Sequence, residues 1–278
     1  MMVCRYDAER LLLILQIDHS RVAGLLAAHW GNEEFARLSP YSSMVLAAQE
    51  HDNGWWDWEV KPTINAEGRL TDYIGFFRHL GHATWLDFYR NGIERLAKQD
   101  PYAGLIVLMH GEGLLTQGKG LLTYMPDYSG VPPVKDFLDE REVRRQALLR
   151  TVRSSAQFRG AATDEHIWLN YKYMEVFDQL GQFICNRYPL NNTERKNGPS
   201  NTLSGVPVAP GKSDTGLTVN VKDEWNAVVT PYPFDVDPLP VPIAARILPD
   251  RVYTSQEDLL SEYYPAQRVT YTYTLHRG

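Results

Sequence analysis

Residues 49–56, Gln-Glu-His-Asp-Asn-Gly-Trp-Trp, form the most informative segment of this 278-residue chain. Residues 41–51 carry apolar side chains at helical spacing, and Asn53-Gly54 is a typical stop signal, so His51 and Asp52 are predicted at the end of a helix. An imidazole next to a carboxylate is a combination that divalent metal ions accept. A single His-Asp pair also arises by chance in a chain of this composition, so its meaning depends on the other histidines.

The other candidate ligands come one at a time from separate predicted elements. His19 lies where a predicted strand turns into a helix, and His82 lies at the start of a helix. His110 ends an apolar run, and Asp178 lies mid-helix among aromatic residues. A buried carboxylate needs a partner, which a metal ion, an arginine or backbone donors can supply. Helical proteins commonly build metal sites from several helices. The predicted metal ligands are His19, His51, Asp52, His82, His110 and Asp178.

The ligand types limit the metal and the chemistry. Imidazoles and carboxylates without a thiolate suit one or two ions of Fe, Mn or Zn and disfavour a structural zinc site. Asp52 and Glu50 are the candidate catalytic residues, with Glu50 as a general base or as a group that orients a ligand. A plain surface position is the alternative for Glu50. The expected partner is a small-molecule substrate, and a homodimer is allowed for.

The rest of the chain predicts helices framed by strands. An N-terminal hairpin over residues 2–6 and 10–16 precedes several helices, the last over 165–188. Residues 217–221, 225–230, 243–247 and 268–275 then have the pattern of strands. We expect a mainly α fold of α+β type, with a helical core and a small β-sheet from the N-terminal hairpin and the C-terminal strands. The expected parts are a helical domain (1–190), a loop (191–216) and a β-rich extension (217–278) packed on the same domain.

Composition excludes several classes of protein. Twenty-eight Lys and Arg against 34 Asp and Glu give a net charge of −6, and the chain has no basic tract, which argues against nucleic acid or an anionic membrane as a partner. The longest apolar runs, 22–28 and 104–109, fall short of the roughly 20 residues that a membrane helix needs. The N-terminus lacks the pattern of a secretory signal. Two cysteines form no disulfide framework, so a reducing cytoplasm is expected.

The order of the candidate ligands resembles a known superfamily. A His, then His-Asp, then two His and a late Asp resembles the HD-domain metal-dependent phosphohydrolases. The six-ligand version is similar to their di-iron branch, which includes oxygenases of the inositol oxygenase type. More closely, the segments 16–20, 51–55, 100–103 with His110, and 231–234 resemble a bacterial family labelled domain of unknown function 3891. This second resemblance covers nearly the whole chain and supplies no activity.

The HD-type resemblance implies His19, His51, Asp52 and Asp178 as the basic metal set, with Asp52 bridging a second ion. His82 and His110 would complete that second site, and His79 is an alternative to His82. Two features depart from the HD pattern. The chain has a C-terminal sheet, and no Lys or Arg lies beside the His51-Asp52 pair. The first hypothesis is an HD-type phosphohydrolase acting on a phosphorylated small molecule, the second a di-iron oxygenase, and the third a non-catalytic binding or sensing protein.

Overall fold

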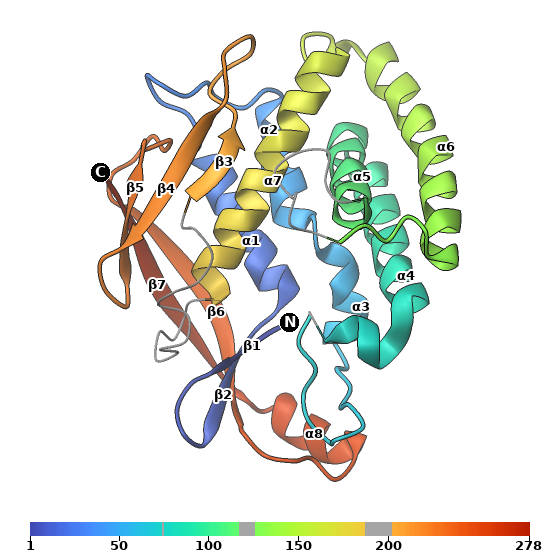
Figure 1. Cartoon of the computed structure of the whole chain (residues 1–278), viewed down its shortest axis with the longest axis vertical. Helices are drawn as coiled ribbons and strands as arrows, with labels where there is room; N and C mark the ends of the chain where they lie inside the picture. Colours follow the sequence, from blue (N-terminus) through green and yellow to red (C-terminus); the bar gives the residue numbers. More distant parts are fainter. Residues whose placement is uncertain (74, 117–125, 187–201) are drawn as a thin grey trace.

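The computed structural model describes residues 1–73, 75–116, 126–186 and 202–278. About 49% of the residues are helical and 22% lie in strands, and the strands form one curled sheet of seven that takes residues from both ends of the chain. The expectation of a mainly helical, HD-like core with a small sheet is therefore wrong. The strands do come from the two chain ends, as expected. Together they form a curled sheet, a half-barrel, that makes up one of the two layers of the fold (Figure 1).

The sheet order places the N-terminal hairpin at one edge and the expected loop region at the other. In that order the strands are β1 (Met2–Arg5), β2 (Arg10–Ile14), β6 (Leu239–Pro249), β7 (Gln267–Arg277), β5 (Asn226–Thr230), β4 (Thr215–Val221) and β3 (Thr202–Val206). β5 and β7 are parallel, and all other neighbours are antiparallel. Residues 202–206 of the expected loop thus form a strand, whereas residues 187–201, with the predicted end of the last long helix, lie outside the described residues.

Strand β6 shows why the full size of the sheet was not predicted: only its residues 243–247 were expected as a strand, whereas it spans Leu239–Pro249. Leu239, Val241 and Ile243 on β6 are buried, and Pro240 and Pro242 between them are exposed, so the alternation of a half-buried strand is present. Proline cannot donate a ladder hydrogen bond and argues against a central strand. Here β2 pairs only with residues 246–249 of β6, so the two prolines lie where one side of β6 has no such neighbour.

Helices α1 to α7 form a layer on one face of the sheet, and α8 lies apart from them at the lower end of the molecule in Figure 1. Within that layer α5 lies among α2, α4, α6 and α7, while α1 and α7 contact the strands. The helices are α1 (Gln16–Ala28), α2 (Tyr41–Glu50), η1 (Asn53–Trp55), α3 (Trp56–Glu59), α4 (Phe76–Gln99), α5 (Pro101–Leu115), α6 (Pro132–Ser154), η2 (Ala156–Phe158), α7 (Asp164–Asn186) and α8 (Gln256–Tyr263). No helix in the described part of the chain is long and apolar enough to cross a membrane.

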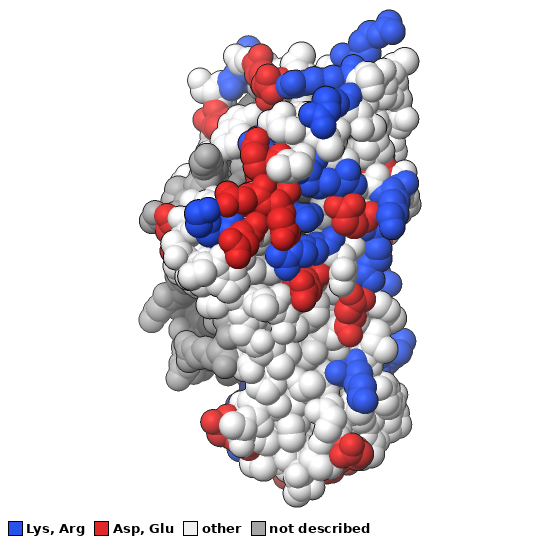
Figure 2. Space-filling model, turned by 90° about the vertical axis from the view of Figure 1, so that its right-hand side faces the viewer, with Lys and Arg blue, Asp and Glu red and all other residues white. Residues whose placement is uncertain are grey.

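The outer helices are joined by ion pairs. Arg144 on α6 makes two bonds of 2.8 Å to Glu94 on α4, and Arg90 on α4 binds Glu140 on α6 at 2.9 Å. Figure 2 shows this side of the molecule, where acidic and basic side chains intermingle. Charges of both signs are thus interspersed among the described residues of this face.

Candidate metal centre

Three helices bring the candidate ligands together. His19 lies one turn into α1, His51 directly follows the last residue of α2, and Asp178 lies in the middle of α7. The start of α1 is stabilised by the carboxylate of Glu59, which accepts a hydrogen bond of 2.7 Å from the backbone N–H of Gln16. All three candidate ligands are buried, and they form a group that could hold a metal ion.

The ligand atoms have the spacing of a coordination shell. His51 Nε2 lies 3.3 Å from Asp52 Oδ2 and 3.3 Å from Asp178 Oδ1. His19 contacts the same two carboxylates, with Nδ1 3.3 Å from Asp52 Oδ2 and Nε2 3.3 Å from Asp178 Oδ1. Ligands at roughly 2.0–2.1 Å from a tetrahedral zinc-like ion are about 3.3 Å apart, because the tetrahedral angle fixes the edge length. The group of His19, His51 and Asp178 therefore has dimensions that a metal ion could accept, and Asp52 lies beside it.

The tautomer of His51 sets the chemistry of the group. Its Nδ1 lies 2.8 Å from the backbone carbonyl oxygen of Ala48, a partner that can only accept, so Nδ1 carries a proton. In a neutral imidazole Nε2 then carries a lone pair, and it is a buried atom without a hydrogen bond. A lone pair that faces two carboxylate oxygens is repelled unless a proton or a cation lies between them. Either a proton on His51 or a metal ion held by His19, His51 and Asp178 could meet this requirement.

Two amides hold the carboxylates from outside the group. Gln182 Nε2, one turn beyond Asp178 on α7, donates to both oxygens of Asp178 at 3.1 and 3.0 Å. Gln16 Nε2 donates to Asp52 Oδ2 at 3.3 Å. Outer partners of this kind fix the orientation of metal ligands. Gln16 and Gln182 were not among the predicted site residues, but they support the two aspartates.

The electrostatics of the metal-free group favour charge separation. Burial alone would lower the pKa of His51, but the carboxylates of Asp52 and Asp178 raise it well above its ordinary value. Burial would raise the pKa values of Asp52 and Asp178, but the neighbouring histidines His51 and His19 lower the pKa of Asp52, and His51 and His110 lower that of Asp178. A proton on His51 therefore balances the carboxylates when no ion is present.

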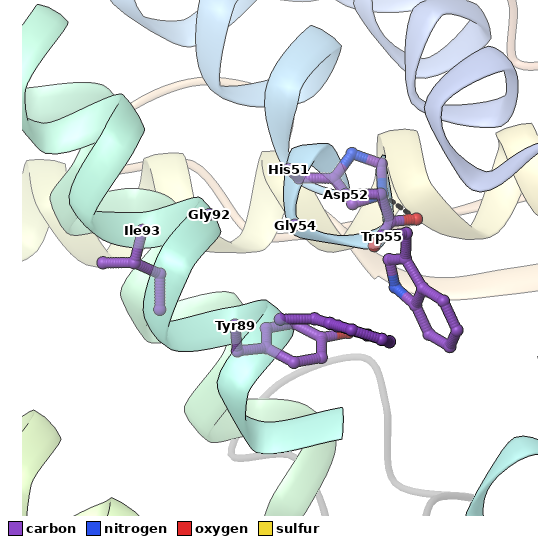
Figure 3. A pocket seen from close by; sticks show the side chains of 8 residues that line it. His51, Asp52, Gly54, Trp55, Tyr89, Gly92 and Ile93 are labelled. Carbon is purple, nitrogen blue, oxygen red and sulfur yellow. Dashed lines mark ion pairs between the residues drawn. The ribbon is translucent and has the colours of Figure 1, made fainter. Parts of the chain in front are cut away.

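A small cavity adjoins His51 and Asp52. It has a volume of about 10 Å³ and lies between the turn after α2 and helix α4, with Trp55 and Tyr89 on its wall (Figure 3). This is about the space that one water molecule needs. Burial, with the charges of Asp52 and Asp178, raises the pKa of Tyr89 well above its ordinary value, so its hydroxyl stays protonated. The cavity can therefore hold one water molecule beside the ligands.

A second buried pair lies next to His51. The rings of His51 and His110 are edge to face with their centres 5.3 Å apart, and His110 Nδ1 lies 2.7 Å from Glu175 Oε1. Sequence reasoning missed Glu175, which is fully buried. Its spacing of three residues from Asp178 on an apolar helix places both on one face, and that spacing was the signal that could have identified it. Burial raises the pKa of Glu175, and His110 offsets this only in part.

The remaining predicted residues lie elsewhere. The His82 ring lies 5.9 Å from that of Tyr128, and His82 does not belong to the His19–His51–Asp178 group. Its alternative, His79, has Nε2 3.0 Å from the hydroxyl of Thr63. Glu50 precedes His51, but its side chain accepts a hydrogen bond from Gln49 and lines a separate surface cleft. The structure thus assembles His19, His51, Asp52 and Asp178, with His110 alongside.

Fold and site together define an α+β protein with a buried histidine–aspartate centre. The chain belongs to the family described as "Protein of unknown function (DUF3891)", whose model matches residues 2–250. No curated protein and no solved structure matches it. The closer of the two expected resemblances is confirmed by this match, whereas the resemblance to HD domains rested on ligand order and is not confirmed.

Proposed function

We propose that His19, His51, Asp52 and Asp178 bind one divalent transition-metal ion and that the protein is a metal-dependent hydrolase of a small phosphate ester. The observation that supports the metal is the position of His51 Nε2, buried without a hydrogen bond and 3.3 Å from two carboxylate oxygens. The absence of a thiolate from the group, together with its imidazole and carboxylate ligands, favours Fe, Mn or Zn.

A bound divalent ion supplies a Lewis acid that lowers the pKa of an adjacent water molecule towards 7. The chain's own groups supply the rest. His51 and Asp52 line the water-sized cavity, and the His110–Glu175 pair beside His51 can hold a proton on His110 Nδ1 or Glu175 Oε1. Gln16 and Gln182 hold the two aspartates in place during the reaction.

The size of the cavity constrains the substrate. At about 10 Å³ it accepts a water molecule but not a phosphoryl group. Substrate entry then requires the side chains of Trp55 and Tyr89 on its wall to move. We therefore expect slow hydrolysis of small substrates. The alternative is a closed metal site with a structural role only.

The first experiment measures metal content by inductively coupled plasma mass spectrometry on untagged wild type, His51→Ala and His29→Ala. His29 is a matched control because it pairs with Asp235 at the surface, 2.9 Å away, outside the centre. We expect about one equivalent of Fe, Mn or Zn in wild type and in His29→Ala and none in His51→Ala. Metal-free wild type that takes up none of these ions contradicts the proposal.

The second experiment measures phosphate release from p-nitrophenyl phosphate after reconstitution with Mn²⁺, Zn²⁺ or Fe²⁺. Activity in wild type and His29→Ala that is lost in His51→Ala supports the hydrolase. If the protein binds one equivalent of metal tightly but hydrolyses neither this nor other small phosphate esters, the metal has a structural role only. The protein is then the non-catalytic binding or sensing protein of the third hypothesis.

A further inference from the structure

A second concave site lies on the outer side of the same turn. The chain from Glu50 to Asn53 separates it from the metal centre, because Glu50 and Asn53 line the cleft whereas His51 and Asp52 line the inner cavity. The cleft has a volume of about 330 Å³ and lies between the start of α1, the end of α2 and the end of α4. This volume lies within the range of small-molecule sites.

Trp56 gives the cleft an apolar surface. Its side chain is 50% exposed, although tryptophan is highly buried on average. A tryptophan face carries a negative quadrupole and attracts the weakly positive C–H groups of a saturated ring laid against it. A flat ligand with an apolar face can therefore stack here.

The other side chains of the cleft offer paired donors and acceptors. Gln49 and Gln99 carry amides, each with a donor and an acceptor group. Gln49 Nε2 also donates to Glu50 Oε1 at 3.3 Å. The amide of Asn53 is used internally, because its Nδ2 donates to the backbone carbonyl oxygens of Glu50 and Gly92. Glu50 adds carboxylate oxygens on the same wall. Neighbouring hydroxyl groups of a ligand, which both donate and accept, match such a lining better than a purely donating or purely accepting ligand does.

The charges at the cleft favour a neutral ligand. Arg21 binds Asp18 at 2.7 Å, and Arg95 binds Asp57 through two bonds of 2.8 and 3.1 Å. Both guanidinium groups are thus already balanced by carboxylates, and Glu50 adds a further negative charge. An anion would gain no unbalanced positive charge there, while the free N–H groups of Arg21 can still donate to a hydroxyl.

We propose that this cleft is a carbohydrate-binding site that accepts a mono- or disaccharide, with one sugar ring stacked on Trp56 and its hydroxyls bound by the amides of Gln49 and Gln99. The site does not depend on the proposed metal chemistry. It adds a binding function on the outer side of the turn that carries His51 and Asp52.

The test is saturation-transfer difference NMR of the full chain with glucose, N-acetylglucosamine, cellobiose and maltose at millimolar concentration, and with adenosine as a nucleoside. We expect transfer to the C–H protons of at least one sugar with wild type and with Trp168→Ala. Trp168 is the matched control because it is 39% exposed on α7, away from the cleft. Trp56→Ala is expected to reduce the signal about fivefold or more.

Three further variants keep the result interpretable. Gln99→Ala, at the end of α4, is expected to weaken binding, while Lys98→Ala beside it leaves binding unchanged. His51→Ala is expected to retain sugar binding, so failure of the metal proposal is distinguishable from failure of this one. No transfer to any of the four sugars, transfer to adenosine alone, or an equal signal in Trp56→Ala would overturn the proposal.

Discussion

The ring of His19 lies against the backbone of Gly181, so closely that a Cβ atom at position 181 would be 2.9 Å from Nε2 and 3.1 Å from Cδ2 of the ring. Gly181 lies on α7, one turn after Asp178. Glycine in a helix interior costs about 1 kcal/mol relative to alanine. The contact explains this glycine, since any side chain at 181 would push the candidate ligand out of position.

Gly181→Ala is therefore expected to separate metal binding from stability. The added methyl displaces the His19 ring and lowers metal affinity by roughly 10- to 100-fold. The gain in helix propensity offsets the local strain, so the free energy of unfolding of the metal-free protein changes by no more than about 1 kcal/mol. Competition with a chelator and urea denaturation measure the two quantities. Gly160→Ala, where a Cβ atom meets nothing within 4 Å, is the control. Unchanged affinity in Gly181→Ala would remove His19 from the ligand set.

A second glycine fixes the turn that carries His51 and Asp52. A Cβ atom at Gly54 would lie 1.9 Å from the carbonyl oxygen and 2.6 Å from the carbonyl carbon of Phe88, both in the backbone of α4. Backbone atoms of a helix cannot yield as a side chain does, so Gly54→Ala is expected to destabilise the protein by about 3 kcal/mol or more. Urea denaturation of the metal-free protein measures the loss. Gly130→Ala, in open space, is expected to be neutral, and equal stability of the two variants would contradict the packing of this turn against α4.

These contacts show what the sequence could and could not predict. The predicted helix that ends before Asn53-Gly54 follows from local signals and is confirmed as α2 with His51 directly after it. The seven-stranded sheet depends on pairing between residues far apart, such as Leu13 with Arg246, which no local pattern specifies.

The residues of the candidate metal centre could also be predicted only in part. His51 and Asp52 are neighbours in the chain, and their shared helix end could be inferred directly. The presence of a histidine on a predicted helix does not say which way its side chain faces, so His82 was included among the predicted ligands, in the second site, with His79 as an alternative. Glu175 lies on the same face of the helix as Asp178, but only the structure shows that it is fully buried and therefore needs a partner, which His110 supplies.

The His110–Glu175 pair yields a stability prediction. Both side chains are almost completely inaccessible, and the bond between them is 2.7 Å long. Removing one partner leaves a buried polar group uncompensated, so His110→Leu is expected to cost about 3–5 kcal/mol. The double variant His110→Leu, Glu175→Met removes both polar groups and is expected to recover most of that loss. Urea denaturation of both variants and of Glu175→Met completes the cycle, and a double variant less stable than His110→Leu would show that the pair is not coupled.

The pH dependence of stability follows from the opposite shifts in the centre. The pKa of His51 is raised above 6.5, so its contribution to metal-free stability is complete below pH 6.5 and is lost as the pH rises through the raised value. The pKa values of Asp52 and Asp178 are lowered below 3.8, so their contributions are complete above pH 3.8 and are lost only in stronger acid. The raised pKa values of His110 and Glu175 act in the same direction as that of His51.

Metal-free protein is therefore expected to lose thermal stability as the pH rises above 6.5, with a smaller loss in His51→Gln, which lacks the titrating ring. Metal affinity is expected to have the opposite slope, because Nε2 of His51 must release its proton before it can bind an ion. Thermal denaturation with a chelator and with saturating Zn²⁺, over the same pH series, measures both. If the chelator-treated protein instead becomes more stable as the pH rises, His51 is neutral in the metal-free centre and the charge balance with Asp52 and Asp178 must be assigned differently.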